Sequence, residues 1–130
     1  MMRRWASWLA ALLLIAWFAP SAALAVAPVE YSDKAFAAAQ ARGQTIVVET
    51  YASWCLPCRI QAPIIDRLRA REPLRRIVLF RIGEETPKAI WRRFRLNGFG
   101  MIVVFKGDRE MARGTPTNEA AVADLLHRGL

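Results

Sequence analysis

The chain has 130 residues, a hydrophobic fraction of 55% and a formal net charge of +8. That length suits one domain and excludes a second domain with its own core. A charged fraction of 23%, with 7 glycines and 7 prolines, excludes a disordered chain and a fibrous repeat.

The first 25 residues have the composition of an export signal. Arg3 and Arg4 give a positive start, and an apolar run follows over residues 8–19. The segment Ala23-Leu24-Ala25 places small residues at the two positions that a signal peptidase requires. The apolar run is shorter than the roughly 20 residues that span a membrane.

We therefore predict a cleaved signal peptide over residues 1–25 and one domain over residues 26–130. An uncleaved anchor over residues 5–29 is the alternative, and it would associate the protein with the inner membrane. Either form places the domain in the periplasm. There the excess of arginine indicates a solvated basic surface, and no nucleic-acid partner is expected.

The rest of the chain alternates β-branched and helical segments. In chain order we predict an extended start at 29–31, a helix over 33–42, a strand over 45–51, a helix over 55–71, a strand over 76–82, a helix over 87–94, a strand over 101–105, a returning strand over 109–112 and a last helix after 117. Strands that alternate with helices imply right-handed crossovers. The expected fold is an α/β three-layer sandwich, a central mixed sheet with helices on both faces.

Residues that cap helices mark the predicted boundaries. Ser32, Thr86 and Thr117 are expected to be N-caps, and Pro87 is expected at the first helical position. In the helix over 55–71, the predicted inner side consists of Ile60, Ile64, Ile65 and Leu68.

Two cysteines, Cys55 and Cys58, lie where the strand over 45–51 gives way to a helix. The free N–H groups and the dipole of a helix start favour a negative charge, and only the thiolate attacks a disulfide. Cys58, one turn later, is placed to resolve the resulting mixed disulfide. Pro57 stiffens this first turn without loss of a helical hydrogen bond.

Two structural explanations of the cysteine pair are weaker. A disulfide that closes so short a loop would stabilise the fold little. A zinc site needs four ligands, and the other strong candidate, His127, lies near the far end of the chain. The pattern therefore favours a redox pair that needs no metal and no cofactor.

Glu49 is the lone charge in a strand that otherwise has the composition of a core strand. A carboxylate buried near the thiols would have a raised pKa and could take the proton of Cys58. A solvated position at the strand end is the alternative.

The segment Tyr51-Ala52-Ser53-Trp54-Cys55-Leu56-Pro57-Cys58-Arg59 resembles the active-site signature of the thioredoxin family, and Ile60, Ala62, Pro63, Ile64 and Asp66 continue the match. The resemblance implies that Cys55 is the nucleophile, that Cys58 is the resolving cysteine and that Glu49 occupies the buried acidic position. It also implies a substrate-binding surface made of Trp54, Leu56, Pro57, Phe99 and Gly100.

Gly100 departs from the family pattern, because family members have a cis-proline there whose neighbouring backbone pairs with the substrate. A cis bond before a non-proline residue costs about 3 kcal/mol. We therefore expect a trans peptide and a looser loop over residues 97–100.

The preferred hypothesis is a thiol-disulfide oxidoreductase of exported, disulfide-containing proteins, working as a reductase and kept reduced by a membrane-bound electron donor. A second hypothesis is a Cu(I)-handling or partner-binding module in which Met101 joins the cysteines; Met101 is otherwise an ordinary core residue. A third is a redox-inactive structural subunit.

Overall fold

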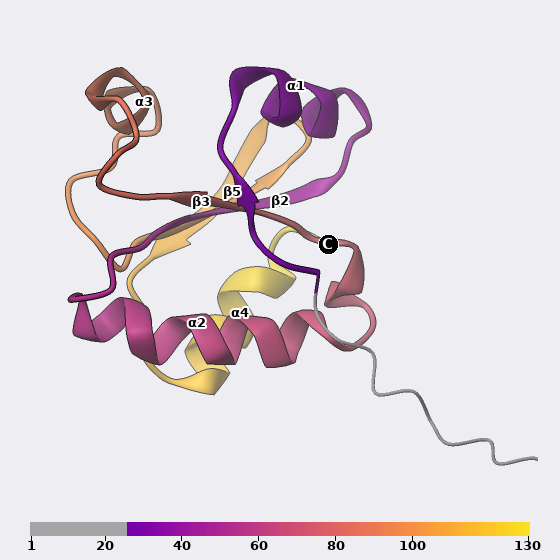
Figure 1. Cartoon of the computed structure of the whole chain (residues 1–130). Coiled ribbons are helices and arrows are strands. Elements are labelled where there is room, and N and C mark those ends of the chain that lie inside the picture. The colour runs from indigo at the N-terminus through magenta and orange to yellow at the C-terminus, as the bar shows by residue number, and fades with distance from the viewer. Residues whose placement is uncertain (1–25) are drawn as a thin grey trace, which may run out of the picture.

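The computed structural model describes residues 26–130 and contains five strands and four α-helices in this part of the chain (Figure 1). Their order is β1 (Val29–Glu30), α1 (Asp33–Ala41), β2 (Thr45–Thr50), α2 (Leu56–Arg69), the 3-10 turn η1 (Leu74–Arg76), β3 (Val78–Ile82), α3 (Lys88–Arg93), β4 (Ile102–Lys106), β5 (Arg109–Gly114) and α4 (Glu119–His127). The predicted element order is confirmed. The signal peptide predicted over 1–25 lies outside the described residues.

One mixed sheet forms the centre of the fold, with strand order β1-β3-β2-β4-β5. The strands β1, β3 and β2 run parallel, whereas β4 is antiparallel to both β2 and β5. Because β2 is the middle strand and both of its faces are covered, all six of its residues are buried. This explains its nearly continuous run of β-branched residues.

Helices cover both faces of the sheet, as the sequence predicts. In Figure 1, α1 and α3 lie above the sheet and α2 and α4 lie below it. Phe36 of α1 and Phe94, the C-cap residue of α3, pack with Val48 on the upper face. Ile65 of α2 and Leu126 of α4 pack on the lower face. The fold is therefore a three-layer α/β sandwich.

Alternation along β2 assigns its side chains to these two faces. Val47 belongs to the core below the sheet and Val48 to the core above it. Because side chains alternate, Glu49 points toward α2 and Thr50 points the other way. Of these two side chains, that of Glu49 is therefore on the side of the sheet covered by α2, the helix that carries Cys58.

Two of the three predicted helix caps differ from the structure. Ser32 caps α1 as expected, accepting a hydrogen bond from the N–H of Ala35. Pro87, not Thr86, is the N-cap of α3, because the Thr86 hydroxyl accepts the N–H of Gly83 and closes the preceding turn. Asn118, not Thr117, caps α4.

The inner face of α2 also differs in part. Ile64 and Ile65 are buried and Leu68 is half-buried, but Ile60 is exposed. Cys58 and Gln61 begin the buried face instead. Ile60 is two positions after Cys58, which is about 200° around a helix, and it therefore points to solvent.

The helix α2 ends at Arg69, earlier than predicted, and η1 occupies the first residue of the predicted strand over 76–82. The longest helix within residues 26–130, α2, has 14 residues. None of the helices described there is long and apolar enough to cross a membrane.

Candidate active site

The cysteines lie at the carboxyl end of the central strand. After β2 ends at Thr50, a tight turn leads to Cys55, which is the N-cap residue of α2. Cys55 and Cys58 form a disulfide. Both side chains are almost fully buried, at 5% and 2% exposure. The sequence-based placement of the pair at a helix start is confirmed.

The sulfur of Cys55 receives a backbone hydrogen bond. The N–H of Cys58 donates to Cys55 Sγ at 3.3 Å, as the side chain of an N-cap residue does. This N–H is one of the donors that a helix start leaves without a partner. The same bond and the helix dipole stabilise negative charge on Cys55 Sγ once the disulfide is reduced.

The sulfur of Cys58 faces the strand instead. Cys58 Sγ lies 3.4 Å from the backbone oxygen of Thr50. In the reduced protein a thiol at this position can donate a hydrogen bond to that oxygen. The two sulfurs therefore have different surroundings, a backbone donor at Cys55 Sγ and a backbone acceptor at Cys58 Sγ.

A loop over residues 97–101 covers the disulfide from the other side. Gly100 N–H donates to Thr50 O at 3.1 Å, and Thr50 N–H donates to Met101 O at 2.9 Å. The Thr50 hydroxyl donates to Gly98 O at 2.9 Å. The peptide bond before Gly100 is trans, as predicted. The expectation of a looser loop is wrong, because the loop is bonded to β2 at several points.

An aromatic cluster borders the disulfide on one side. Trp54 is 63% exposed, and its ring meets that of Phe99 edge to face at 5.0 Å. Phe99 in turn contacts Trp91 of α3 at 5.1 Å. Trp54 Nε1 donates to Glu84 Oε1 at 2.9 Å, which fixes the indole. A pocket of about 630 Å³ lies beside this cluster, lined in part by Glu84, Trp91 and Phe99.

The five predicted substrate-binding residues lie around the disulfide. Trp54, Leu56 and Pro57 are exposed, Phe99 is half-buried and packs against the cysteines, and Gly100 lies against Pro57. The described residues thus place one exposed, mainly apolar surface next to the two sulfurs.

Glu49 is buried, at 3% exposure, which confirms that part of the sequence prediction. Its Oε1 lies 2.6 Å from Arg81 Nη2, and Arg81 Nε also donates to it at 2.7 Å. Burial raises the pKa of Glu49 above its ordinary value of 4.5, and the Arg81 charge opposes that rise. Asp66 raises the same pKa further and Arg69 lowers it.

The position of Glu49 relative to Cys58 follows from the strand. Glu49 immediately precedes Thr50, whose backbone oxygen contacts Cys58 Sγ. Glu49 also points toward α2, the helix that carries Cys58. A carboxylate with a raised pKa therefore faces α2 from the strand residue next to the one whose backbone oxygen contacts Cys58 Sγ.

Comparison with known proteins decides the family. The family model described as Thioredoxin matches residues 27–127. The chain belongs to the thioredoxin family. It is therefore a thioredoxin-like thiol-disulfide oxidoreductase with a Cys55–Cys58 redox pair.

Individual relatives agree with this assignment. The chain is 25% identical to Thioredoxin-1 of Saccharomyces cerevisiae over 91 residues, which cover 70% of this chain and 86% of that protein. It is 28% identical to Thioredoxin-T of Drosophila melanogaster over 88 residues, 68% of this chain, and spans only 55% of that protein's length. Among solved structures, Trxlp from Edwardsiella tarda EIB202 matches with a TM-score of 0.71 and 32% identity, covering 75% of this chain and 96% of that chain.

Three residues of this thioredoxin-like site were not identified from the sequence. Arg81 pairs with Glu49 from the neighbouring strand, Thr50 hydrogen-bonds the loop over residues 97–101, and Gln61 donates to Gly100 O. Gln61 had a detectable signal, since it lies three residues after Cys58, on the inner face of the active-site helix. Arg81 had none, because its pairing with Glu49 depends on the register of two strands.

Met101 takes the core role that the sequence favoured. It is buried with the residues above the sheet, and its sulfur accepts a hydrogen bond from Asn97 N–H at 3.4 Å. Residues 26–130 contain no group of three or more His, Cys, Asp or Glu side chains arranged around a metal site. The position of Met101 gives the Cu(I) hypothesis no support.

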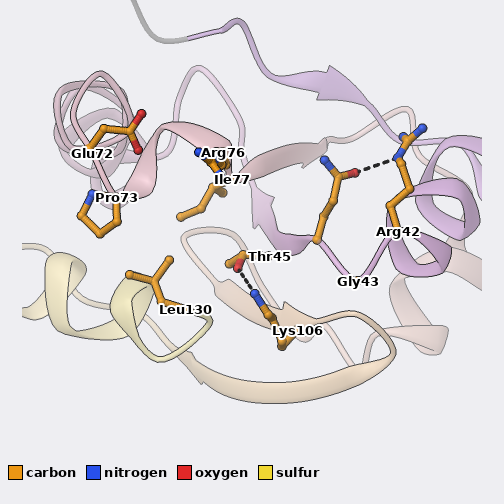
Figure 2. A pocket seen from close by; sticks show the side chains of 10 residues that line it. Arg42, Gly43, Thr45, Glu72, Pro73, Arg76, Ile77, Lys106 and Leu130 are labelled. Atoms are coloured by element: carbon orange, nitrogen blue, oxygen red, sulfur yellow. Dashed lines mark hydrogen bonds between the residues drawn. The ribbon is translucent and has the colours of Figure 1, made fainter.

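A second pocket, of about 590 Å³, lies at the opposite end of the sheet (Figure 2). It is lined by Arg42, Gly43, Gln44, Thr45, Glu72, Pro73, Arg76, Ile77, Lys106 and Leu130. Arg42 and Lys106 bond neutral neighbours there, Gln44 at 3.2 Å and Thr45 at 3.4 Å. Because Thr45 and Thr50 are the two ends of β2, this pocket is remote from the disulfide.

Proposed function

We propose that this thioredoxin-like protein reduces disulfides of exported proteins in the periplasm and is itself kept reduced by a membrane-bound electron donor. The observation that carries the proposal is the unequal surroundings of the two sulfurs. Cys55 Sγ accepts a helix-start N–H, whereas Cys58 Sγ faces a backbone oxygen. Cys55 is therefore the nucleophile that attacks the substrate, and Cys58 is the cysteine that resolves the mixed disulfide.

The reaction follows from this arrangement in two displacements. The Cys55 thiolate attacks one sulfur of the substrate disulfide, and the other substrate sulfur leaves as a thiolate. Cys58 then loses its proton and attacks Cys55 Sγ, which releases the second substrate sulfur. Two electrons pass from the cysteine pair to the substrate, and the donor restores the pair through its own dithiol.

The proton of Cys58 needs an acceptor in the second displacement. We assign that role to Glu49, because it is buried under α2 next to the residue that contacts Cys58 Sγ. Its raised pKa makes it a stronger base than a solvated carboxylate. Arg81 holds the carboxylate in place through two short contacts.

The substrate surface consists of Trp54, Leu56, Pro57, Phe99 and Gly100. Trp54 and Leu56 are 63% and 64% exposed, so two large apolar side chains face solvent on either side of Cys55. They border the disulfide, and covering them with a substrate polypeptide removes apolar area from water. This surface supports polypeptides, rather than small disulfides, as the substrates.

Two parts of the proposal are supported by the sequence: that the protein is exported, and that it reduces disulfides rather than forms them. The composition of residues 1–25 supports export, and Pro57 together with the resemblance to reducing family members supports reduction. Release of a mature chain that begins at Val26 would be seen by N-terminal sequencing. A redox potential near that of thioredoxin, about −270 mV, is expected, whereas a value near −120 mV would contradict the reducing role.

Trapping with Cys58→Ser tests the function directly. Without the resolving thiol, mixed disulfides should accumulate on Cys55, and mass spectrometry of the captured proteins should find exported proteins with cysteine pairs. The Cys55→Ser, Cys58→Ser double variant is the control for nonspecific capture. Captured proteins that all lack an export signal, or equal capture by both variants, would overturn the proposal.

A further inference from the structure

Gln61 is a polar side chain in an apolar position. It lies on the inner face of α2 and is 2% exposed. Residues around it on the same face are Cys58, Ile64 and Ile65. A buried amide is unfavourable unless its hydrogen-bonding groups have partners, so its partners indicate its role.

Both donors of the amide are engaged. Gln61 Nε2 lies 2.8 Å from Gly100 O and 2.8 Å from Pro116 O. An amide nitrogen carries two N–H groups, so each carbonyl receives one. Gln61 therefore connects the active-site helix to the docking loop over 97–101 and to the segment before α4.

Gly100 is held from three sides by these contacts. Its N–H donates to Thr50 O at 3.1 Å and its carbonyl accepts from Gln61. A Cβ built on it would lie 3.2 Å from Pro57 Cβ, so its Cα rests against the active-site turn. Its φ of +82° is one that a proline cannot adopt and that other side chains rarely adopt.

Phe99, the residue before Gly100, has free backbone groups. Neither its N–H nor its carbonyl has a hydrogen-bond partner among residues 26–130. Its ring packs between Trp54 and Trp91, which fixes its position beside the disulfide. An unpaired N–H and carbonyl at a defined position can pair with an extended polypeptide.

We infer that Gln61 is a positioning residue for substrate polypeptides: it fixes the carbonyl of Gly100 and thereby the backbone of Phe99 next to Cys55 and Cys58. In this chain the amide of Gln61 holds the substrate-binding backbone in position, whereas other family members have a cis-proline in that loop. Gln61 touches no reacting atom. The inference rests on the proposed reduction of polypeptide disulfides and names a further residue for it.

Gln61→Met tests the inference, since methionine has a similar volume and no donor. Insulin and hydroxyethyl disulfide are the two substrates, with dithiothreitol as the electron source, because only insulin has a backbone to pair with Phe99. We expect KM for insulin to rise about tenfold, as loss of a buried hydrogen bond implies, with kcat for both substrates retained. Amide exchange at Gly100 should become faster.

Gln40→Met is the matched control. Gln40 Nε2 also donates to a glycine carbonyl, that of Gly107 at 3.5 Å, but at the other end of the sheet. It should leave KM for insulin unchanged. An unchanged KM for insulin in Gln61→Met, or an equal loss with both disulfides, would overturn the role of Gln61. Failure of the native chain to reduce insulin would instead overturn the proposed function, and the inference with it.

Gln61→Glu keeps the inference testable if the methionine variant does not fold. A protonated carboxyl retains one donor for Gly100 or Pro116, and an ionised one has none. The ratio of its KM for insulin to that of the native chain should therefore increase from mildly acidic to mildly alkaline pH. A ratio that does not change with pH would contradict the inference.

Discussion

The burial of Glu49 is unfavourable for its charged form, and the same burial gives the carboxylate the raised pKa that a proton acceptor needs. Its carboxylate is buried at 3% exposure, and burial raises its pKa above 4.5. Arg81, which is one-third exposed, lies 2.6 Å from it and reduces that rise. The partner therefore keeps the group ionisable, while burial keeps it basic enough to accept a proton.

Glu49→Gln should slow the second displacement. Glutamine keeps the shape of the side chain but accepts no proton, so we expect release of a mixed disulfide from Cys55 to slow by about 100-fold at neutral pH. In the native chain the rate should rise with pH as Glu49 loses its proton, at a pH above 4.5, and the variant should lack this rise. Stopped-flow measurement of release across a pH series checks both.

Glu85→Gln is the control for this change, because Glu85 is exposed and lies before α3. It should keep both the native rate and its pH dependence. If Glu49→Gln releases the mixed disulfide at the native rate throughout the pH series, Glu49 does not accept the proton of Cys58.

The sequence predicts that α4 exists but does not determine which residue caps its start. Thr117 is the N-cap that we predict from the sequence, but its neighbour Asn118 is a residue type that caps helices at least as well. In the structure the Asn118 side chain accepts the N–H of Ala121 at 2.9 Å. The choice depends on the path of the chain from β5 to α4, where Pro116 O is held by Gln61, and no local pattern reports that contact.

Asn118→Ala should lower the free energy of unfolding by about 1 kcal/mol, the usual effect of losing a cap. Thr117→Ala is the matched control, and since Thr117 is exposed and is not the cap, its effect should stay within about 0.5 kcal/mol. Urea denaturation of the three proteins measures both differences. Equal destabilisation by the two substitutions would contradict the observed cap.

Strands and helices were otherwise predictable, because each has its own periodic pattern. The run of β-branched residues in β2 identified a buried central strand, and Cys55 at its end could be placed at a helix start. The ion pair of Glu49 could not be foreseen, since Arg81 is 32 positions away in sequence and meets it only through the parallel register of β2 and β3.

At the scale of the whole molecule, tertiary contacts reverse one local expectation. A glycine in place of proline suggested a looser docking loop, which is sound reasoning for an isolated segment. The fold, however, brings Thr50 of β2 and Gln61 of α2 against that segment, and both hydrogen-bond to it. The rigidity of the loop is therefore a property of the assembled sandwich.

Gly129, which follows α4, packs closely against the central strands β2 and β4. It is buried after the end of α4, and its carbonyl accepts a hydrogen bond from the Thr45 hydroxyl. A Cβ at this position would lie 2.5 Å from Thr45 Cγ2 and 2.7 Å from Val104 Cγ1, too close for either atom to remain in place. Both neighbours belong to central strands, where packing leaves little space to move.

Gly129→Ala should therefore lower the free energy of unfolding by about 1–3 kcal/mol, as overpacking of a core does. Gly98→Ala is the comparison, because nothing lies within 4 Å of a Cβ there, and its effect should stay within about 0.5 kcal/mol. Urea denaturation of both variants gives the difference. A Gly129→Ala protein as stable as the native chain would show that α4 can shift on β2 and β4 without loss, and that its close approach to the sheet does not stabilise the fold.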